Sequence, residues 1–362
     1  MFVCPFKKVT IQKNLVMSNI SCNSNTNFLA IGGEAGFLKV VKIDLSKQRK
    51  NPDGTAASPL TFTQNLTTHK NKITIVTWNS IYDKLTTCDE EGVIVVWKMS
   101  EKDQWETEMI NNREVSIIND LKWSAMGNFL CFIYEDGHAI VGTVEGSRSW
   151  GNDIKSGLYK VEWSPDETFL LFCVRNNNIV LFSSSGYQIG EMEIPGHLQS
   201  VLISEIMWWT NPLIEHKTIV DDKHLTLVFE NGTILFYDNH QDLKPAEIKT
   251  NLVSILKAEW CPNGEILAIA GIIIEDEQKK QAVNFYSNTG KFLQDTKIPN
   301  KITSICWENH GTRIAITTDT FILFCLVKPN YKWTYFSDTL VYSFMTDSEH
   351  NTIVFLGYKK KY

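Results

Sequence analysis

Several features that mark common classes of protein are missing from this 362-residue sequence. It contains no run of about 18 apolar residues, and the segment from Met1 to Lys8 lacks the basic-then-apolar order of a signal peptide. Its eight cysteines form no Cys-x-x-Cys pair and no Cys/His group at zinc spacing. These absences predict a cytoplasmic protein with reduced thiols, no metal site and no other cofactor.

An excess of basic residues is also missing. The formal net charge is −6 and the sequence pI about 5.8, whereas proteins that bind nucleic acid through its phosphates usually present a basic face. We therefore expect no nucleic-acid partner. The clusters of basic residues are short and indicate solvated loop charges: Lys7-Lys8, Arg49-Lys50, Lys279-Lys280 and Lys359–Lys361.

No arrangement of residues predicts catalysis. Cys88, Cys131 and Cys173 recur at similar places along the chain, which indicates small buried core residues, and no histidine nearby would activate a thiolate. The glycine-rich stretch Gly32–Gly36 lies between two expected strands, not between a strand and a helix as phosphate-binding loops do. The sequence predicts a protein that is not an enzyme.

A repeat that ends in tryptophan runs through the chain. Six segments of matching pattern end in Trp, and a seventh, upstream, has Cys22 in that place. The steps between them are 56, 45, 40, 45, 52 and 47 residues, and a four-stranded propeller blade needs about 40–45, so loop insertions explain the excess. The tryptophans are Trp78, Trp123, Trp163, Trp208, Trp260 and Trp307. The insertions are expected at Ser46–Ser58, Asn211–Lys223 and Glu275–Gln281.

Turn residues repeat in the same register. A residue that tolerates positive φ follows the Trp position by 14 residues in the first four copies, and after a longer loop in the fifth. These residues are Gly36, Gly92, Gly137, Asn177 and Gly232. Together the two landmarks predict an all-β fold, a seven-bladed WD40-type β-propeller over residues 1–328.

The two ends of the predicted ring carry their own expectations. The segment Lys8–Ile11 is short and β-prone, and we expect it to complete the seventh blade after Phe321–Val327. Residues 329–362 lie outside the repeat and form either a junction or the first strands of a second propeller. Thr339–Phe344 and Thr352–Leu356 are predicted to be strands there.

The aromatic residues of the repeat have a structural interpretation. Their periodicity predicts that each of the six tryptophans packs in the blade core. Adjacent strand residues point to opposite faces, so Trp209 is expected to face away from the core and mark a partner contact. His69 stands where WD repeats place a buried histidine, bonded to a turn acid and a closing Trp. Thr87, Glu91 and Trp97 are expected to complete this network.

Several stretches are more specific than the blade pattern: Val76–Asn79, Asp89–Trp97, Glu108–Arg113, Tyr134–Gly137, Arg148–Asp153 and Pro329–Trp333. This set resembles the N-terminal propeller of the WD-repeat core subunits of intraflagellar transport complex A. The resemblance covers Val40 through Trp333 and is weakest at Asn211–Lys223. Members of that family continue into a second propeller and an α-solenoid, so the resemblance implies an N-terminal part of a longer subunit.

The resemblance implies a non-catalytic protein-interaction scaffold that serves retrograde ciliary transport, cilium assembly and the entry of membrane proteins into cilia. Its implied location is the cytoplasm, the cilium and the basal body. Its implied partners are other subunits of the complex and cargo adaptors, with only indirect membrane contact. The alternative is a coat-like propeller that contacts anionic lipids or cargo tails through Lys7, Lys8 and Lys359–Lys361.

Overall fold

The structure of the chain is a computed structural model. It describes residues 1–11, 15–43, 60–113, 116–155, 157–175, 178–210, 223–237, 245–308, 311–328, 332–336, 339–345 and 351–357. Within these residues the regular structure is β-strand, apart from one 3₁₀ turn, η1 (Gly196–Leu198). The predicted loops Ser46–Ser58 and Asn211–Lys223, except for Lys223 itself, lie outside the described residues, as does the predicted turn residue Asn177.

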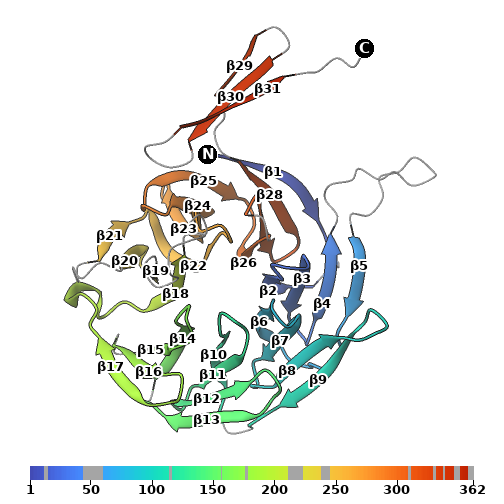
Figure 1. The fold of residues 1–362 in the computed structure, drawn as a ribbon, viewed down its shortest axis with the longest axis vertical. Coiled ribbons are helices and arrows are strands. Elements are labelled where there is room, and N and C mark those ends of the chain that lie inside the picture. The colour runs from blue at the N-terminus through green and yellow to red at the C-terminus, as the bar shows by residue number, and fades with distance from the viewer. Residues whose placement is uncertain are drawn as a thin grey trace.

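Seven four-stranded antiparallel sheets surround a common axis (Figure 1), so the predicted seven-bladed propeller is confirmed. Each sheet is a blade, and the blades are numbered 1 to 7 along the chain. Blade 1 contains β2 (Met17–Cys22), β3 (Phe28–Gly33), β4 (Leu38–Ile43) and β5 (Leu60–Asn65). Blade 2 contains β6 (Ile73–Asn79), β7 (Lys84–Asp89), β8 (Ile94–Met99) and β9 (Trp105–Asn111). Blade 3 contains β10 (Ile118–Trp123), β11 (Phe129–Tyr134), β12 (His138–Thr143) and β13 (Arg148–Asp153).

The remaining blades repeat the same plan. Blade 4 contains β14 (Leu158–Trp163), β15 (Phe169–Val174), β16 (Ile179–Ser183) and β17 (Gln188–Met192). Blade 5 contains β18 (Ile203–Thr210), β19 (Lys223–Phe229), β20 (Thr233–Tyr237) and β21 (Ala246–Lys249). Blade 6 contains β22 (Leu252–Trp260), β23 (Ile266–Glu275), β24 (Gln278–Ser287) and β25 (Phe292–Ile298). Blade 7 contains β26 (Ile302–Trp307), β27 (Arg313–Thr318), β28 (Ile322–Lys328) and β1 (Phe2–Val9).

The ring closes through its N-terminal strand. β1 pairs antiparallel with β28, from Phe2 opposite Lys328 to Val9 opposite Ile322. The prediction that an N-terminal strand completes the seventh blade is confirmed, but its expected bounds, Lys8–Ile11, are wrong. The strand begins at Phe2 and ends at Val9, and Pro5 lies within it. Proline is tolerated there because β1 is the outermost strand of its blade and has only one neighbour.

The hydrophobic core is divided among the interfaces between blades. Seven clusters of buried side chains each combine two neighbouring blades, including blades 7 and 1, where Val9 and Phe324 pack with Ile20 and Leu29. The second strand of a blade is buried along nearly its whole length, as in β11, β15 and β27. A blade therefore buries both of its faces, and only the closed ring gives every blade two neighbours.

The glycines of the predicted turns have the positive φ that such turns require. Gly36, Gly92, Gly137 and Gly232 have φ of 70°, 82°, 92° and 84°. At Gly36 an added Cβ would lie 2.2 Å from the carbonyl oxygen of His69, so the position excludes other residues.

The expected insertion Glu275–Gln281 is a different case. It is not a loop, because β23 and β24 continue as a long hairpin whose two turn residues, Asp276 and Glu277, have φ of 52° and 62°.

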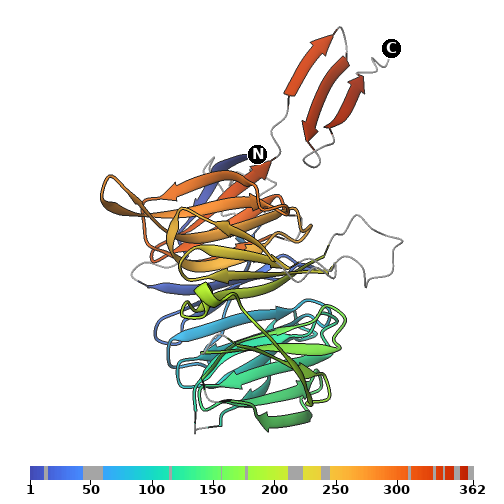
Figure 2. The same ribbon diagram turned by 90° about the vertical axis from the view of Figure 1, so that its left-hand side faces the viewer.

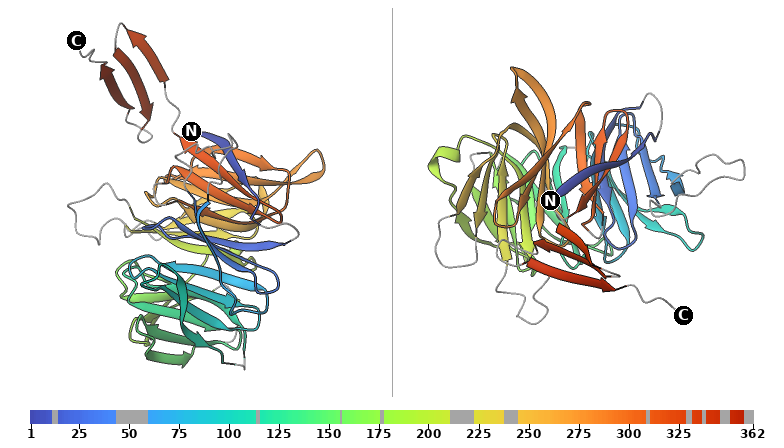
Figure 3. Two further views of the ribbon diagram at one scale, coloured as in Figure 1. Left: turned by 90° about the vertical axis from the view of Figure 1, so that its right-hand side faces the viewer. Right: turned by 90° about the horizontal axis from the view of Figure 1, so that it is seen from above.

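A three-stranded sheet follows the ring. It contains β29 (Lys332–Phe336), β30 (Thr339–Met345) and β31 (Asn351–Gly357), which confirms the two predicted strands and adds β29. The sheet projects from the ring beside blade 7, as the side view of Figure 2 and both views of Figure 3 show. Among the described residues, its three strands pair only with one another.

Candidate functional site

The repeated tryptophans lie at the ends of the innermost strands. Trp78, Trp163 and Trp307 are buried, with 8%, 2% and 3% of their surface exposed, whereas Trp123, Trp208 and Trp260 are partly buried. Each packs in a cluster between two blades.

The indole nitrogens of five of these six tryptophans join successive blades. Trp123 donates to the hydroxyl of Thr86 at 3.0 Å, and Trp260 donates to that of Thr226 at 3.3 Å. The other three donate to backbone carbonyls of the preceding blade: Trp78 to Ser21, Trp163 to Lys122 and Trp307 to Glu259, each at 3.1 Å. The row is thus a set of inter-blade ties, not an exposed aromatic stripe.

Trp208 and Trp209 depart from this pattern. Neither indole nitrogen has a hydrogen-bond partner among the described residues. Trp209 is only 9% exposed and packs on His224 and Trp260, with ring centroids 4.6 Å and 6.1 Å away. The expectation that it faces away from the core is wrong, because the opposite face of a blade is also buried by a neighbouring blade. A partner contact at Trp209 remains a prediction that this burial does not favour.

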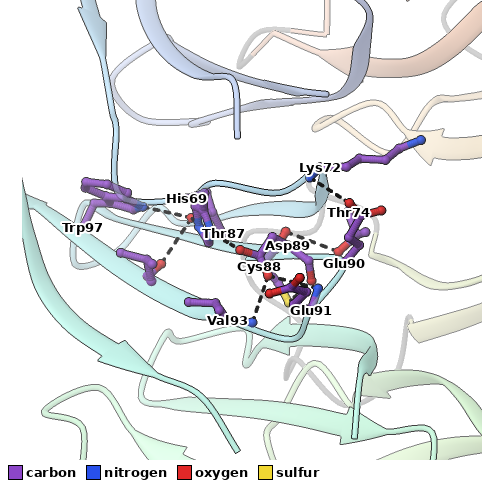
Figure 4. Close-up of polar contacts among 11 residues, drawn as sticks. His69, Lys72, Thr74, Thr87, Cys88, Asp89, Glu90, Glu91, Val93 and Trp97 are labelled. Carbon is purple, nitrogen blue, oxygen red and sulfur yellow. Dashed lines mark hydrogen bonds and ion pairs between the residues drawn. The ribbon is translucent and has the colours of Figure 1, made fainter. Parts of the chain in front are cut away.

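Blade 2 contains a buried hydrogen-bond network around His69 (Figure 4). Nδ1 of His69 lies 2.8 Å from Oδ2 of Asp89, and Nε2 lies 2.8 Å from the hydroxyl of Thr87. Nε1 of Trp97 donates to the same hydroxyl at 2.9 Å. The predicted members Thr87 and Trp97 are therefore present, but the acid is Asp89, at the end of β7, and not Glu91. The exposed Glu91 instead donates its backbone N–H to Asp89.

The network and the burial of the histidine favour its neutral form. Both ring nitrogens are bonded, Nδ1 to Asp89 and Nε2 to the hydroxyl of Thr87. That hydroxyl accepts from Trp97 and also lies 3.5 Å from the carbonyl oxygen of Val95. Burial lowers the pKa of His69, although the hydrogen bond and the charge of Asp89 act in the opposite direction. The arrangement joins the segment before β6 to β7 and β8 and leaves the histidine no free nitrogen with which to act as a base or ligand.

Charged side chains surround the ring axis in blades 3 to 6. Nζ of Lys122 in blade 3 lies 3.3 Å from Glu162 in blade 4. Glu205 in blade 5 is paired on both sides, with Lys160 of blade 4 at 3.5 Å and Lys257 of blade 6 at 3.0 Å. These ion pairs cross between innermost strands, so they add electrostatic ties to the indole hydrogen bonds.

The pKa shifts follow from this pairing. Burial would raise the pKa of Glu205, yet Lys160, Lys257 and Lys122 hold it at about 2. Glu162 raises the pKa of Lys122. Glu259 has Lys257 near it, but burial is the larger influence and raises its pKa to about 7. Glu205 is thus ionised at neutral pH, and Glu259 titrates near it.

Sequence reasoning missed these charges, although a signal was present. They occupy the positions one and three residues before the repeated Trp: Lys122 and Asp120, Glu162 and Lys160, Glu205, and Glu259 and Lys257. Because side chains alternate along a strand, these positions share the face opposite the Trp. Opposite charges in successive copies would have indicated cross-blade pairs.

The cysteines behave as core residues. Cys88, Cys131 and Cys173 are fully buried on the second strands of blades 2, 3 and 4. Burial raises the pKa of Cys88 to about 12 and those of the other two as well, so these thiols stay protonated. Within the described part of the chain, no three His, Cys, Asp or Glu side chains gather as metal ligands would. Among the same residues, no helix has the length and apolarity that a membrane crossing requires.

Comparison with known proteins assigns the ring to a family. A family model described as WDR35/TULP4 N-terminal matches residues 1–328. The chain belongs to this family. WD repeat-containing protein 35 of Homo sapiens is 37% identical over 354 residues and that of Rattus norvegicus 36%, each covering 95% of this chain. Tubby-related protein 4 of Mus musculus is 28% identical over 329 residues, which cover 80% of this chain.

The family match coincides with the ring, because residue 328 is the last residue of β28. The chain spans 30% of the length of the WD repeat-containing protein 35 relatives and 20% of Tubby-related protein 4. The predicted resemblance to a WD-repeat propeller of the complex A type is confirmed at the level of the family.

Proposed function

We propose that this chain is a non-catalytic interaction scaffold of intraflagellar transport complex A. It takes part in retrograde ciliary transport and in the entry of membrane proteins into cilia, and it acts in the cytoplasm, the cilium and the basal body. The observation that carries the proposal is the similarity to WD repeat-containing protein 35 along 95% of the chain. Its partners are other subunits of that complex and cargo adaptors.

The structure supports a scaffold in physical terms. The His69 network, the Trp indoles and the axial ion pairs all hold blades in place. What remains for partners is the set of turns at the two faces of the ring, and turns on a rigid frame are where binding residues are commonly found. A propeller that catalysed a reaction would need accessible reactive groups, whereas both nitrogens of His69 are bonded and the thiols of Cys88, Cys131 and Cys173 are buried.

The three-stranded sheet supports the proposal that further domains follow. Tyr335 and Leu356 share one face of the sheet and are 62% and 52% exposed, while Phe336 and Phe355 share the other and are 79% and 69% exposed. A sheet that is apolar on both faces needs cover on both sides, as a propeller blade does. We assign β29–β31 to the first blade of a second propeller.

Cross-linking mass spectrometry on the intact complex, purified through the endogenous full-length protein, tests the scaffold role. We expect cross-links from lysines of the ring, such as Lys72, Lys102 and Lys291, to at least one other subunit. Failure of the other subunits to co-purify with the full-length protein, or their co-purification without any cross-link from the ring, would contradict the proposal.

A membrane-binding alternative has one observation in its favour. β1 presents exposed Phe2 and Phe6, at 56% and 46%, next to Lys7 and the exposed Lys8, a combination that suits an anionic lipid surface. Lys8 is already placed over the Phe321 ring at 3.8 Å, and Lys359–Lys361 lie outside the described residues. Flotation with phosphatidylserine vesicles distinguishes the scaffold role from the membrane-binding alternative. If the wild-type chain and a Phe2→Ser, Phe6→Ser variant both remain unbound, the membrane-binding alternative is excluded.

A further inference from the structure

Four neighbouring hairpin turns form a continuous surface at one face of the ring. They join the first and second strands of blades 1 to 4 and contain residues 23–27, 80–83, 124–128 and 164–168. We call them the linked rim. They lie at the end of the blades opposite to the turns of Gly36, Gly92 and Gly137, which join the second and third strands.

Hydrogen bonds connect each turn of the linked rim to the next. Between blades 1 and 2, Nδ2 of Asn23 donates to Asp83 at 3.2 Å, and Asn25 donates to the carbonyl of Ser80 at 2.5 Å. Between blades 2 and 3, Nδ2 of Asn79, next to the turn, donates to the carbonyl of Gly127 at 2.8 Å. These bonds hold the turns in one arrangement before any partner arrives.

The tie between blades 3 and 4 uses a carboxylate. Oε1 of Glu167 accepts the backbone N–H of Met126 at 2.6 Å, and Oε2 accepts Nδ2 of Asn128 at 3.2 Å. Oδ1 of Asn128 accepts a hydrogen bond from the hydroxyl of Tyr82 at 3.0 Å, and this bond links the turn of blade 3 to that of blade 2. Tyr82 and Met126 are therefore on directly connected turns.

Three large apolar side chains of the linked rim point into solvent. Ile81 is 61% exposed, Tyr82 46% and Met126 54%. They come from the two connected turns in the middle of the rim, and we call them the apolar patch. Exposed apolar residues grouped on rigid turns indicate an interaction site more strongly than residues scattered over outer strands, such as Ile110 and Ile189.

The charge around the apolar patch selects the kind of partner. The linked rim contains the carboxylates of Asp83, Asp166 and Glu167 and no Lys or Arg. The turns between the outer strands of blades 2 and 3, residues 100–104 and 144–147, add Glu101, Asp103 and Glu145 against Lys102 alone. This field attracts cations and repels nucleic acid and anionic lipid.

We infer that the linked rim binds a basic segment of a partner protein that carries apolar side chains among its lysines and arginines. The apolar side chains cover Ile81, Tyr82 and Met126, and the basic ones lie against the carboxylates around them. The inference rests on the proposed scaffold function and deepens it, because it names the face that is used and the chemistry of the partner.

A direct binding measurement tests the inference on the isolated chain. The probe is a fluorescent peptide with a Leu-Phe-Leu centre flanked by lysines, and its two comparison peptides replace either the lysines by glutamates or the centre by serines. We expect saturable anisotropy for the first peptide at low salt, weakening as salt rises, and affinities at least about tenfold lower for both comparison peptides.

Matched variants place the peptide on the ring. Ile81→Ser with Met126→Ser should weaken binding about tenfold, whereas Ile274→Ser, 55% exposed at the opposite end of blade 6, should leave it unchanged. Asp83→Asn keeps the oxygen that accepts from Asn23 and removes one negative charge of the linked rim, and it should weaken binding about fivefold. Its control is Glu265→Gln, an exposed carboxylate on the equivalent turn of blade 6. Circular dichroism verifies that each variant is folded.

Two results would overturn the inference: no binding of the lysine peptide by folded wild-type chain, or binding that is equal in the patch variant and the Ile274→Ser control. Neither result bears on the scaffold role, which the cross-linking experiment tests without reference to this face. Conversely, loss of the complex association would leave the peptide measurement intact, so the two failures are distinguishable.

Discussion

The ring and the C-terminal sheet are both built from apolar antiparallel strands, but the faces of the strands are covered in the ring and exposed in the sheet. In the ring, each blade has a neighbour on both faces, and the large apolar residues of its middle strands, such as Phe172 and Phe285, are fully buried. In the sheet of β29–β31, Phe336 and Phe355 are 79% and 69% exposed. Apolar strands contribute to stability only where other elements cover them, and the two regions differ in that cover.

Closure separates the two regions. The N-terminal strand β1 gives blade 7 its fourth strand and brings Val3 and Val9 into the clusters on either side of that blade. The C-terminal sheet has three strands, and its outer strands have no further partner among the described residues. The comparison teaches that ring closure gives every blade two covered faces, whereas the described residues leave both faces of the sheet of β29–β31 exposed.

Removal of β1 should have the largest effect on the ring. Deleting residues 1–9 exposes the edge of β28 and uncovers both neighbouring clusters, at a cost on the order of 5 kcal/mol or more in unfolding free energy. Thermal unfolding followed by circular dichroism measures this loss. The double variant Phe2→Ser, Phe6→Ser keeps the strand and should behave like wild type. A deletion variant that melts within about 2 °C of wild type would show that closure is not needed.

Substitution of His69 should have the next largest effect on the stability of the ring. His69→Ala leaves the Asp89 carboxylate, which is 2% exposed, with only two backbone donors, and the loss should be about 3 kcal/mol. Denaturant titration gives the free energy. Glu91→Ala is the matched control, since Glu91 contributes only its backbone, and we expect less than about 0.5 kcal/mol there. Equal losses in the two variants would contradict the assigned network.

Glu259 should make stability depend on pH. Its pKa is about 7 in the folded chain against an ordinary value of 4.5, so its contribution favours folding at acidic pH and is lost as the pH rises from 4.5 to 7. Glu259→Gln cannot ionise, and it should raise the melting temperature by roughly 2–4 °C above pH 7 and change little near pH 5. The exposed Glu106→Gln is the control. A gain that is equal at both pH values would refute the assignment.

Removal of the C-terminal sheet should have the smallest effect. A chain that ends at Lys328 keeps every strand of the seven blades, so its melting temperature should lie within about 1 °C of that of the full chain. Its solubility should rise, because exposed Phe336 and Phe355 are removed. A large fall in melting temperature would mean that the sheet supports the ring.

Much of the fold could be predicted because its landmarks are local. The spacing of the six tryptophans and the glycines at positive φ follows from the needs of one blade, and it repeats. The start of β1 could not be predicted in the same way, because Pro5 argues against a strand unless that strand is known to be an outer one. The position of β29 also had no local signal apart from Trp333, which belonged to a family motif.

The candidate site was less accessible to sequence reasoning. Trp209 was expected at the surface because adjacent strand residues point to opposite faces. That rule predicts exposure only when one face of a sheet meets solvent, and both faces of a blade are buried. Asp89 ends β7 and Glu91 lies two residues later in the following turn, and only the three-dimensional path of the chain decides which carboxylate meets His69. The linked rim depends on contacts between residues about 40 to 60 positions apart, which the repeat pattern does not reveal.

Hydrogen exchange read by mass spectrometry on the 362-residue chain tests the central claim most directly. If the ring is closed and the following sheet is open, the amides of β1 and β28 exchange as slowly as those of β26 and β27, while those of β29–β31 exchange within seconds. Fast exchange in β1, or protection of β29–β31 equal to that of the blades, would contradict the account.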